Sequence, residues 1–207
     1  MIVEIDPVSP EPWLVARAAE VLRKGGVAII PTDTVYGLAC GISRPDAIKR
    51  IYSLKDMDPK KPLAILVADM TTIGHYARGV TTPYYRLMKR VLPGPYTFIF
   101  EATPEVPKIM LRKRRTIGVR MPDNPITLAL LEALDEPLLT TSVRTPADEW
   151  VIHPLEVEST LDERVDLVVD GGPAVATPST VVDLSGDVPV LLREGKGDVA
   201  ALELFEL

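Results

Sequence analysis

Cations and hydroxyl groups recur at the ends of apolar segments in this sequence. Arg120 and Arg193 each close such a segment, and a guanidinium in that position presents a planar fork of donors to a carboxylate or a phosphate. Thr140 and Ser142 stand near the end of another segment, and Ser179 stands at the start of a further one. Each hydroxyl taken singly is explained as well by strand capping. Their recurrence favours a site in which fixed donors stabilise the charge of a phosphate group.

Two lysines, Lys55 and Lys61, bracket a polar segment that follows a helical pattern. A lysine at a helix C-terminus commonly does no more than complement the helix dipole, which contributes ~0.3–1 kcal/mol. Two flexible ammonium groups this close in sequence would also reach a polyphosphate. We therefore expect both lysines in the phosphate site, with helix-end pairing as the alternative.

The segment PTDTVYGL, residues 31–38, directly follows a short apolar run. Proline ends the run, and the threonines and aspartate then compete for backbone hydrogen bonds in a turn. Loops at the carboxyl ends of strands are where α/β sheets usually bind ligands. The alternative is a well-capped turn with Tyr36 packed on the core, because the segment matches neither a phosphate-binding loop nor a dinucleotide fingerprint.

The composition excludes several kinds of protein. Cys40 is the only cysteine among 207 residues, which rules out an internal disulfide framework and a thiolate zinc cluster. His75 and His153 lack metal-ligand spacing, so we expect no dedicated metal site. The N-terminus has no signal-peptide pattern, and no apolar stretch reaches the ~20 residues that cross a bilayer. We therefore expect a cytoplasmic protein without a membrane partner.

The elements that would position these groups alternate between strand and helix through the first two-thirds of the chain, and strands crowd together at the end. This pattern favours one mixed α/β sheet over a purely parallel one. In the first expected helix, Trp13, Ala18 and Leu22 mark the buried face, and Ser9-Pro10 marks the start. Helical spacing and helix-end signals predict helices over residues 10–24, 45–54, 81–92 and 125–134. Short apolar runs predict strands over 27–30, 63–67, 96–100, 116–120, 138–142, 165–169, 180–184 and 188–192.

Several motifs, in their order and spacing, resemble those of the YrdC-like domain family. They are KGG at 24–26, PTDTVYGL at 31–38, IYxLK at 51–55, KPL at 61–63, LPGPYT at 92–97, IGVRMP at 117–122, PSTVVD at 178–183 and LRxG at 192–195. The resemblance implies a single domain over residues 1–207 with a core of about 11–195. Its fold would be a twisted mixed sheet flanked by helices, with an open cationic cleft.

The resemblance also implies a reaction. The family's best-known members make threonylcarbamoyl-adenylate from L-threonine, bicarbonate and ATP, with Mg²⁺ carried by the nucleotide, for threonylcarbamoyladenosine formation in tRNA. Lys55 and Arg120 would be the catalytic residues. The threonine side would consist of Thr34, Tyr36, Arg120 and Ser179. The ATP side would consist of Lys55, Lys61, Thr140, Ser142, Arg144 and Arg193.

Two motifs depart from the family pattern. The family usually carries lysine–any–arginine where this chain has Met57 in the third position, and serine–alanine–asparagine where it has Arg144 in the third position. An arginine lost at one place and gained at the other would conserve the charge of the site. The same two departures resemble the YciO branch of the family.

The basic stretch of residues 108–120 suggests an alternative function, RNA binding. The formal net charge is −6, which weakens unspecific attraction to nucleic acid unless positive charge is gathered locally. The stretch has no acid and no stacking aromatic, so it would contact an RNA backbone rather than bases. Its RNA-binding candidates are Lys108, Arg112, Lys113, Arg114 and Arg115.

Three functions follow as hypotheses. The first is an ATP-dependent threonylcarbamoyl-adenylate synthase or a close variant, with tRNA-modification proteins as partners. The second is an RNA-binding or ribosome-associated module that binds tRNA or double-stranded RNA and has weak or lost synthase activity. The third is a carbamoylating or nucleotide-hydrolysing enzyme with another small acceptor. A monomer and a homodimer both remain open.

Overall fold

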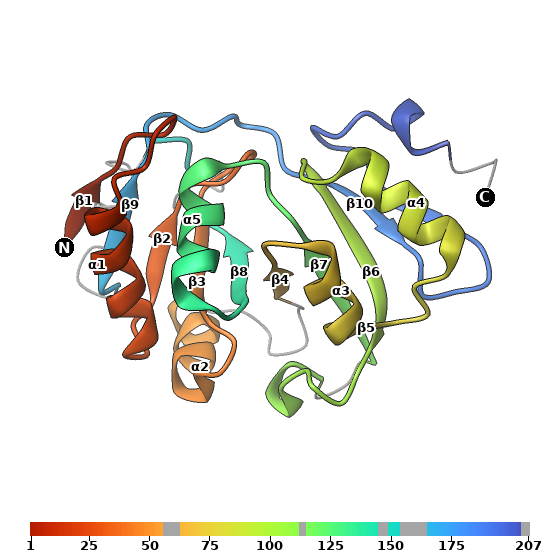
Figure 1. Cartoon of the computed structure of the whole chain (residues 1–207), viewed down its shortest axis with the longest axis horizontal. Helices are drawn as coiled ribbons and strands as arrows, with labels where there is room; N and C mark the ends of the chain where they lie inside the picture. The colour runs from red at the N-terminus through yellow and green to blue at the C-terminus, as the bar shows by residue number, and fades with distance from the viewer. Residues whose placement is uncertain (56–62, 112–114, 145–148, 154–164, 204–207) are drawn as a thin grey trace.

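The computed structural model describes residues 1–55, 63–111, 115–144, 149–153 and 165–203 (Figure 1). The α-helices are α1 (Pro12–Arg23), α2 (Pro45–Leu54), α3 (Met70–Tyr76), α4 (Thr82–Val91) and α5 (Pro125–Leu134). Two 3-10 helices are η1 (Lys108–Leu111) and η2 (Ala200–Leu202). The strands are β1 (Ile2–Glu4), β2 (Ala28–Ile30), β3 (Gly37–Gly41), β4 (Ala64–Leu66), β5 (Ala77–Arg78), β6 (Tyr96–Ala102), β7 (Thr116–Arg120), β8 (Leu138–Ser142), β9 (Leu167–Asp170), β10 (Thr180–Asp183) and β11 (Val190–Arg193).

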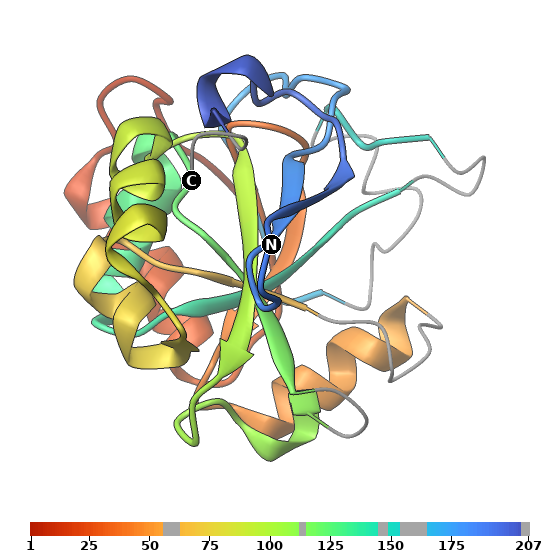
Figure 2. The same ribbon diagram turned by 90° about the vertical axis from the view of Figure 1, so that its right-hand side faces the viewer.

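These strands form one sheet in the order β1-β9-β2-β3-β8-β4-β7-β6-β10-β11, and β5 pairs with β6. The sheet contains both parallel pairs, such as β4 with β7, and antiparallel pairs, such as β4 with β8. The predicted mixed α/β sheet is therefore confirmed. Figure 2 shows that the sheet is strongly twisted, with α1, α3, α4 and α5 on one side and α2 on the other.

Most predicted elements form because their ends carry strong signals. Helices α2 and α5 begin and end where the sequence predicts, and both have proline in the first turn, where no backbone donor is lost. Asn124 caps α5, since its side chain accepts a hydrogen bond from the Thr127 amide at 3.0 Å. Strands β7 and β8 also match their predicted bounds.

The start of the first helix was predicted wrongly. The helix begins at Pro12 rather than after Ser9-Pro10, and Glu11 occupies the cap position without a side-chain cap. Trp13, predicted on the buried face, is 67% exposed. Proline is again the first helical residue, but it is the second proline of the segment. Trp13 is nine residues before Leu22, about half a turn away around the helix, so it points outward while Ala18 and Leu22 are buried.

Among the α-helices and strands of the described residues, four have no counterpart in the prediction: β1, β3, α3 and β5. Strand β3 reads GLACG and is buried at all five positions, so it lacks the polar–apolar alternation that marks a half-exposed strand. It pairs with β2 and β8 in the middle of the sheet.

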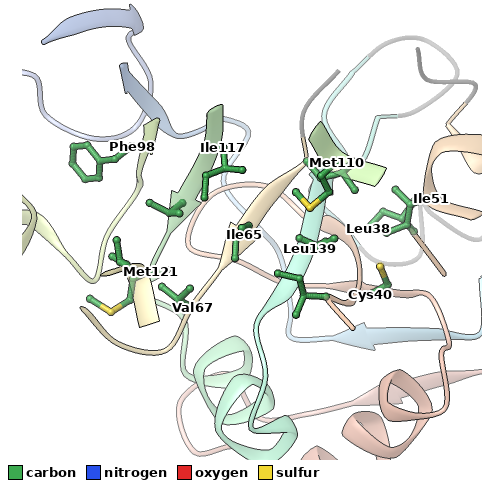
Figure 3. Packing of buried hydrophobic residues seen from close by; sticks show 14 of the residues in the cluster. Leu38, Cys40, Ile51, Ile65, Val67, Phe98, Met110, Ile117, Met121 and Leu139 are labelled. Carbon is green, nitrogen blue, oxygen red and sulfur yellow. The ribbon is translucent and has the colours of Figure 1, made fainter. Parts of the chain in front are cut away.

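The two faces of the central strands differ in side-chain size. One face carries Ile65, Val119 and Leu139, which are opposite one another in register and belong to the large core cluster in Figure 3. The other face carries Ala64, which lies opposite both Gly118 and Thr140. Because successive side chains of a strand point to opposite faces, the positions around Ala64 leave a shallow floor on this second face. Further along the same face, Leu66 and Leu138 pack into a second core cluster with α1 and α5.

The thiol of Cys40 is buried in this core, so its reactivity measures how well the core is packed. Burial, with a smaller contribution from Glu136, raises the pKa of Cys40 to about 12, and its side chain lies inside the core cluster. We predict that a thiol reagent at pH 8 leaves the native chain unlabelled and modifies one thiol per chain after unfolding in urea. Rapid stoichiometric labelling of the native chain would show that the core around β3 is not packed as described.

Candidate functional site

A cleft of about 240 Å³ lies over the floor of small residues. All residues that line it belong to strands or directly adjoin them. They are Leu63, Ala64, Thr97, Ile99, Thr116, Ile117, Gly118, Arg120, Thr140, Thr141, Ser142, Ser179, Val181 and Arg193. The structure thus brings together Arg120, Thr140, Ser142, Ser179 and Arg193, which the sequence separates by as much as 73 positions (193 − 120).

Arg120 joins the cleft to the loop that follows β2. Its Nη2 donates to Thr34 Oγ1 at 2.7 Å, lies 3.4 Å from Thr32 Oγ1 and pairs with Asp33 Oδ1. Strands β3, β8 and β4 separate β2 from β7 in the sheet, so the sheet must curve to make this contact. The loop formed by the PTDTVYGL segment therefore packs against the end of β7 and forms one wall beside the cleft.

Three buried polar atoms around this wall have no hydrogen-bond partner within the part of the chain that the structure describes. They are Asp33 Oδ2, Arg120 Nε and Thr140 Oγ1. The side chains of Arg120 and Asp33 are only 8% and 5% exposed. An unsatisfied buried polar group costs roughly 1–3 kcal/mol, and more if charged. Three such atoms in one place make this end of the cleft a candidate binding site.

The floor makes room for the Thr140 hydroxyl through a glycine. A Cβ atom on Gly37 would lie 2.5 Å from Thr140 Oγ1. Any side chain at residue 37 would therefore fill the space beside the hydroxyl. Glycine in the PTDTVYGL segment thus has a local role at the site as well as in the strand.

A second cluster of donors lies across the cleft. Ser179 Oγ is 2.9 Å from Thr97 Oγ1 and accepts from Arg193 Nη2 at 3.1 Å. Arg193 Nε also donates to the Ser179 main-chain oxygen at 3.0 Å. One hydroxyl of the Thr97–Ser179 pair donates to the other, so one hydroxyl hydrogen remains for a ligand.

Positive charge gathers at this end of the cleft. Burial, together with the nearby charges of Arg120 and Arg144, holds the pKa of Arg193 below its usual value. An anion bound here would relieve that repulsion. Arg144 itself lies over the Trp150 ring, with its guanidinium carbon 3.8 Å from the ring centroid.

Lys55 lies at the C-terminus of α2 and donates to the main-chain oxygen of Ser142. This bond connects the helix end to the end of β8, beside the cleft. Lys61 and Met57 lie outside the residues that the structure describes, so the structure gives a position only for Lys55, and the paired-lysine site stays a prediction.

Tyr36 lies in the core rather than in the lining of the cleft. Its hydroxyl donates to the Gly172 carbonyl oxygen at 2.6 Å and accepts from the Gly171 amide at 3.2 Å. Burial is the main reason why the pKa of Tyr36 rises to about 12. The turn with a core-packed tyrosine, which the sequence left open, describes this side chain, while Thr34 from the same segment contacts Arg120.

The predicted RNA-binding residues lie apart from the cleft lining. Lys108 and Arg115 are exposed, and Arg115 borders a separate hollow with Arg78 and Glu101. Residues 112–114 lie outside the described ranges. RNA binding therefore remains a prediction.

Sequence reasoning missed three residues next to the site: Asp33, Thr97 and Lys196. Asp33 was interpreted only as a turn residue of its segment, and Thr97 only as part of the LPGPYT motif. Lys196 donates to the Asp33 main-chain oxygen at 2.5 Å, and it follows LRxG without any pattern of its own. In the described residues, no group of three or more His, Cys, Asp or Glu is arranged to hold a metal ion.

This fold and cleft define a class of protein. The chain belongs to the Sua5/YciO/YrdC family, whose model, described as "Telomere recombination", matches residues 20–195. Across the described residues, no helix has the length and apolar character needed to cross a membrane.

Particular relatives fall into two groups. The chain is 43% identical to YciO of Escherichia coli K12 over 94% of its own length and 95% of that protein. The crystal structure of E. coli YciO superposes with a TM-score of 0.91 at 41% identity and covers 98% of both chains. The fold is therefore that of YciO over nearly the whole chain.

The relatives in the second group are named as enzymes or belong to the Sua5 proteins. The chain is 34% identical to the threonylcarbamoyl-AMP synthase of Bacillus subtilis over 92% of its own length but only 56% of that protein. Sua5 from P. abyssi, solved in complex with L-threonine, superposes with a TM-score of 0.89 at 30% identity, covering 94% of this chain and 57% of Sua5. The chain thus spans a little over half of these two relatives.

The placement of Tyr36 predicts a pH effect on stability. The raised pKa means that the folded state holds the phenol proton more tightly than the unfolded chain, so this stability is complete below pH 10 and is lost as pH rises toward 12. In Tyr36→Phe, we expect the free energy of unfolding to be roughly 1–3 kcal/mol lower at pH 8, because two backbone groups lose a partner.

Urea unfolding between pH 8 and 11.5 checks both effects. Above pH 10, the wild type should lose about 1.4 kcal/mol per pH unit more than Tyr36→Phe does. Titration of Cys40, also raised, adds the same slope to both proteins. Equal slopes in the two proteins would contradict the buried hydroxyl.

Proposed function

We propose that the cleft binds L-threonine and ATP and joins them with bicarbonate to give threonylcarbamoyl-AMP and pyrophosphate. The observation that carries this proposal is the set of unsatisfied polar atoms around the cleft, Asp33 Oδ2, Arg120 Nε and Thr140 Oγ1. The names of the relatives support the same reaction: synthases of this product match over nearly the whole chain, and one relative was solved with L-threonine.

The threonine side consists of donors that match a carboxylate. Arg120 Nε and the spare hydroxyl hydrogen of the Thr97–Ser179 pair lie in the same lining. Hydrogen bonds between such donors and a charged acceptor are shorter and stronger than neutral ones. Thr34, which shares the Arg120 guanidinium, stands beside them as a further polar contact.

The ATP side consists of the remaining cations. Lys55 is anchored at Ser142, and the charges of Arg144 and Arg193 act on each other. A cleft of about 240 Å³ is smaller than the ~300–1,000 Å³ of pockets that enclose drug-sized ligands. The amino acid therefore occupies the cleft itself, and the nucleotide extends from its mouth over Ser142 and Lys55.

The reaction needs positioning and charge stabilisation rather than a protein nucleophile. The threonine ammonium and bicarbonate give a carbamate, water and a proton. A carbamate oxygen then forms a bond to the α-phosphorus of ATP, and the bond from that phosphorus to the β-phosphate oxygen breaks, so pyrophosphate leaves. Lys55 and Arg193 stabilise the negative charge that develops on pyrophosphate, and Mg²⁺ brought by the nucleotide would neutralise part of it.

Calorimetry on two variants tests this division of the cleft. Arg120→Lys keeps a positive charge beside Asp33 but loses the Nε donor, so L-threonine binding should weaken about 10- to 100-fold. Lys55→Ala should weaken ATP binding by a similar factor and leave L-threonine binding within about threefold, because one charged contact to phosphate is lost.

The matched control is Lys49→Ala. Lys49 lies on the same helix as Lys55 and pairs with Asp46 on the surface, so both affinities should be unchanged. If the two site variants bind L-threonine and ATP as tightly as the wild type does, the residues assigned to this site are wrong.

A further inference from the structure

The Asp33–Arg120 pair makes only one of the two hydrogen bonds that its groups allow. A carboxylate and a guanidinium commonly pair through two parallel bonds. Here Asp33 Oδ1 accepts from Arg120 Nη2, while Asp33 Oδ2 and Arg120 Nε both lack a partner in the described chain. The two remaining atoms are an acceptor and a donor of the same buried pair.

Leaving both atoms unpaired is costly, because each buried group forfeits roughly 1–3 kcal/mol. Arg120 Nη2 is instead shared with the hydroxyls of Thr32 and Thr34. These hydroxyls hold the guanidinium in an orientation that directs Nη2, not Nε, toward the loop. A ligand that offers one donor and one acceptor side by side would complete both members of the pair at once.

The charged groups around Asp33 favour a ligand that carries both a positive and a negative charge. The Asp33 carboxylate stands next to Arg120, and Lys196 donates to the Asp33 main-chain oxygen at 2.5 Å. A site meant for a bare anion gains nothing from a carboxylate in this position, because like charges repel and disfavour such a ligand. A ligand that carries its own positive charge next to a negative one is attracted by both members of the pair.

We propose that Asp33 is a specificity-determining residue that binds the amino group of the substrate through Oδ2, while Arg120 Nε binds the adjacent carboxylate. The proposal rests on the proposed function and deepens it, since it makes the zwitterionic head of an α-amino acid the recognised feature. Both atoms are buried, so the proposal requires the Asp33 side chain to rotate when the amino acid binds.

A ligand pair separates recognition of the amino group from a structural role of Asp33. The ligands are L-threonine and (2S,3R)-2,3-dihydroxybutanoate, in which a hydroxyl replaces the amino group. By calorimetry, the wild type should prefer L-threonine by at least about 10-fold, the effect of one charge-assisted hydrogen bond. In Asp33→Asn, which keeps the shape and loses the charge, this preference should fall to within about threefold.

Two further variants complete the test. Asp33→Glu keeps the charge and should keep a preference for L-threonine even if both ligands bind more weakly. Glu203→Gln removes a carboxylate from an exposed pair with Arg90, away from the cleft lining, and should leave the preference unchanged. Protection of the Cys40 thiol at pH 8 verifies that each variant is folded.

Three outcomes would overturn the inference. If Asp33→Asn weakens both ligands by the same factor, Asp33 only supports Arg120. If the wild type binds both ligands equally, the amino group is not recognised, although the proposed function stands. If the wild type does not bind L-threonine at all, the proposed function fails and the inference falls with it.

Discussion

One guanidinium, that of Arg120, links the loop after β2 to the end of β7, and the shape of the cleft depends on this contact. The side chain is 8% exposed and its partner Asp33 is 5% exposed, so neither charge is compensated by solvent. Removing one member of a buried pair typically costs roughly 3–5 kcal/mol, because the other charge is left unpaired. The loop, the strand end and the curvature of the sheet are therefore stabilised together.

The central strands serve the core and the site at once. Large apolar residues of one face fill the main core, and small or hydroxylated residues on the opposite face form the floor, beside a second core that packs against α1 and α5. Gly37 and Ala64 leave the space, and Thr140 and Arg120 supply the polar atoms. A site on strands of a packed sheet is held more rigidly than one built from loops alone. This rigidity suits a reaction that depends on positioning.

Much of the fold was predictable because its signals are local. Helix α5 has proline at its first residue, an asparagine cap and a continuous apolar pattern, so both ends were predicted. Strand β3 was missed because burial on both faces removes the alternation on which the prediction depends. The start of α1 was misplaced because two prolines offered two starts, and only the packing of the helix decides between them.

Those residues of the candidate site that lie at the ends of strands could be predicted from the sequence. Arg120, Ser179 and Arg193 were found from their positions after or before apolar runs, and the structure brings them together. Asp33 was missed because its partner Arg120 lies 87 residues away, and no pattern of neighbouring residues in the sequence indicates a contact over that separation. Tyr36 stands in the same motif as Thr34, yet its hydroxyl is bonded to Gly172, 136 residues away. Motif membership alone does not say which side chains face the ligand.

The central claim is that this cleft makes threonylcarbamoyl-AMP, and pyrophosphate release by the purified chain tests it most directly. With ATP and Mg²⁺ present, the rate should depend on both L-threonine and bicarbonate and fall to background when either is omitted. The accompanying product should have the mass of threonylcarbamoyl-AMP. Pyrophosphate release that is absent under all these conditions, or that is unchanged without L-threonine, would contradict the account.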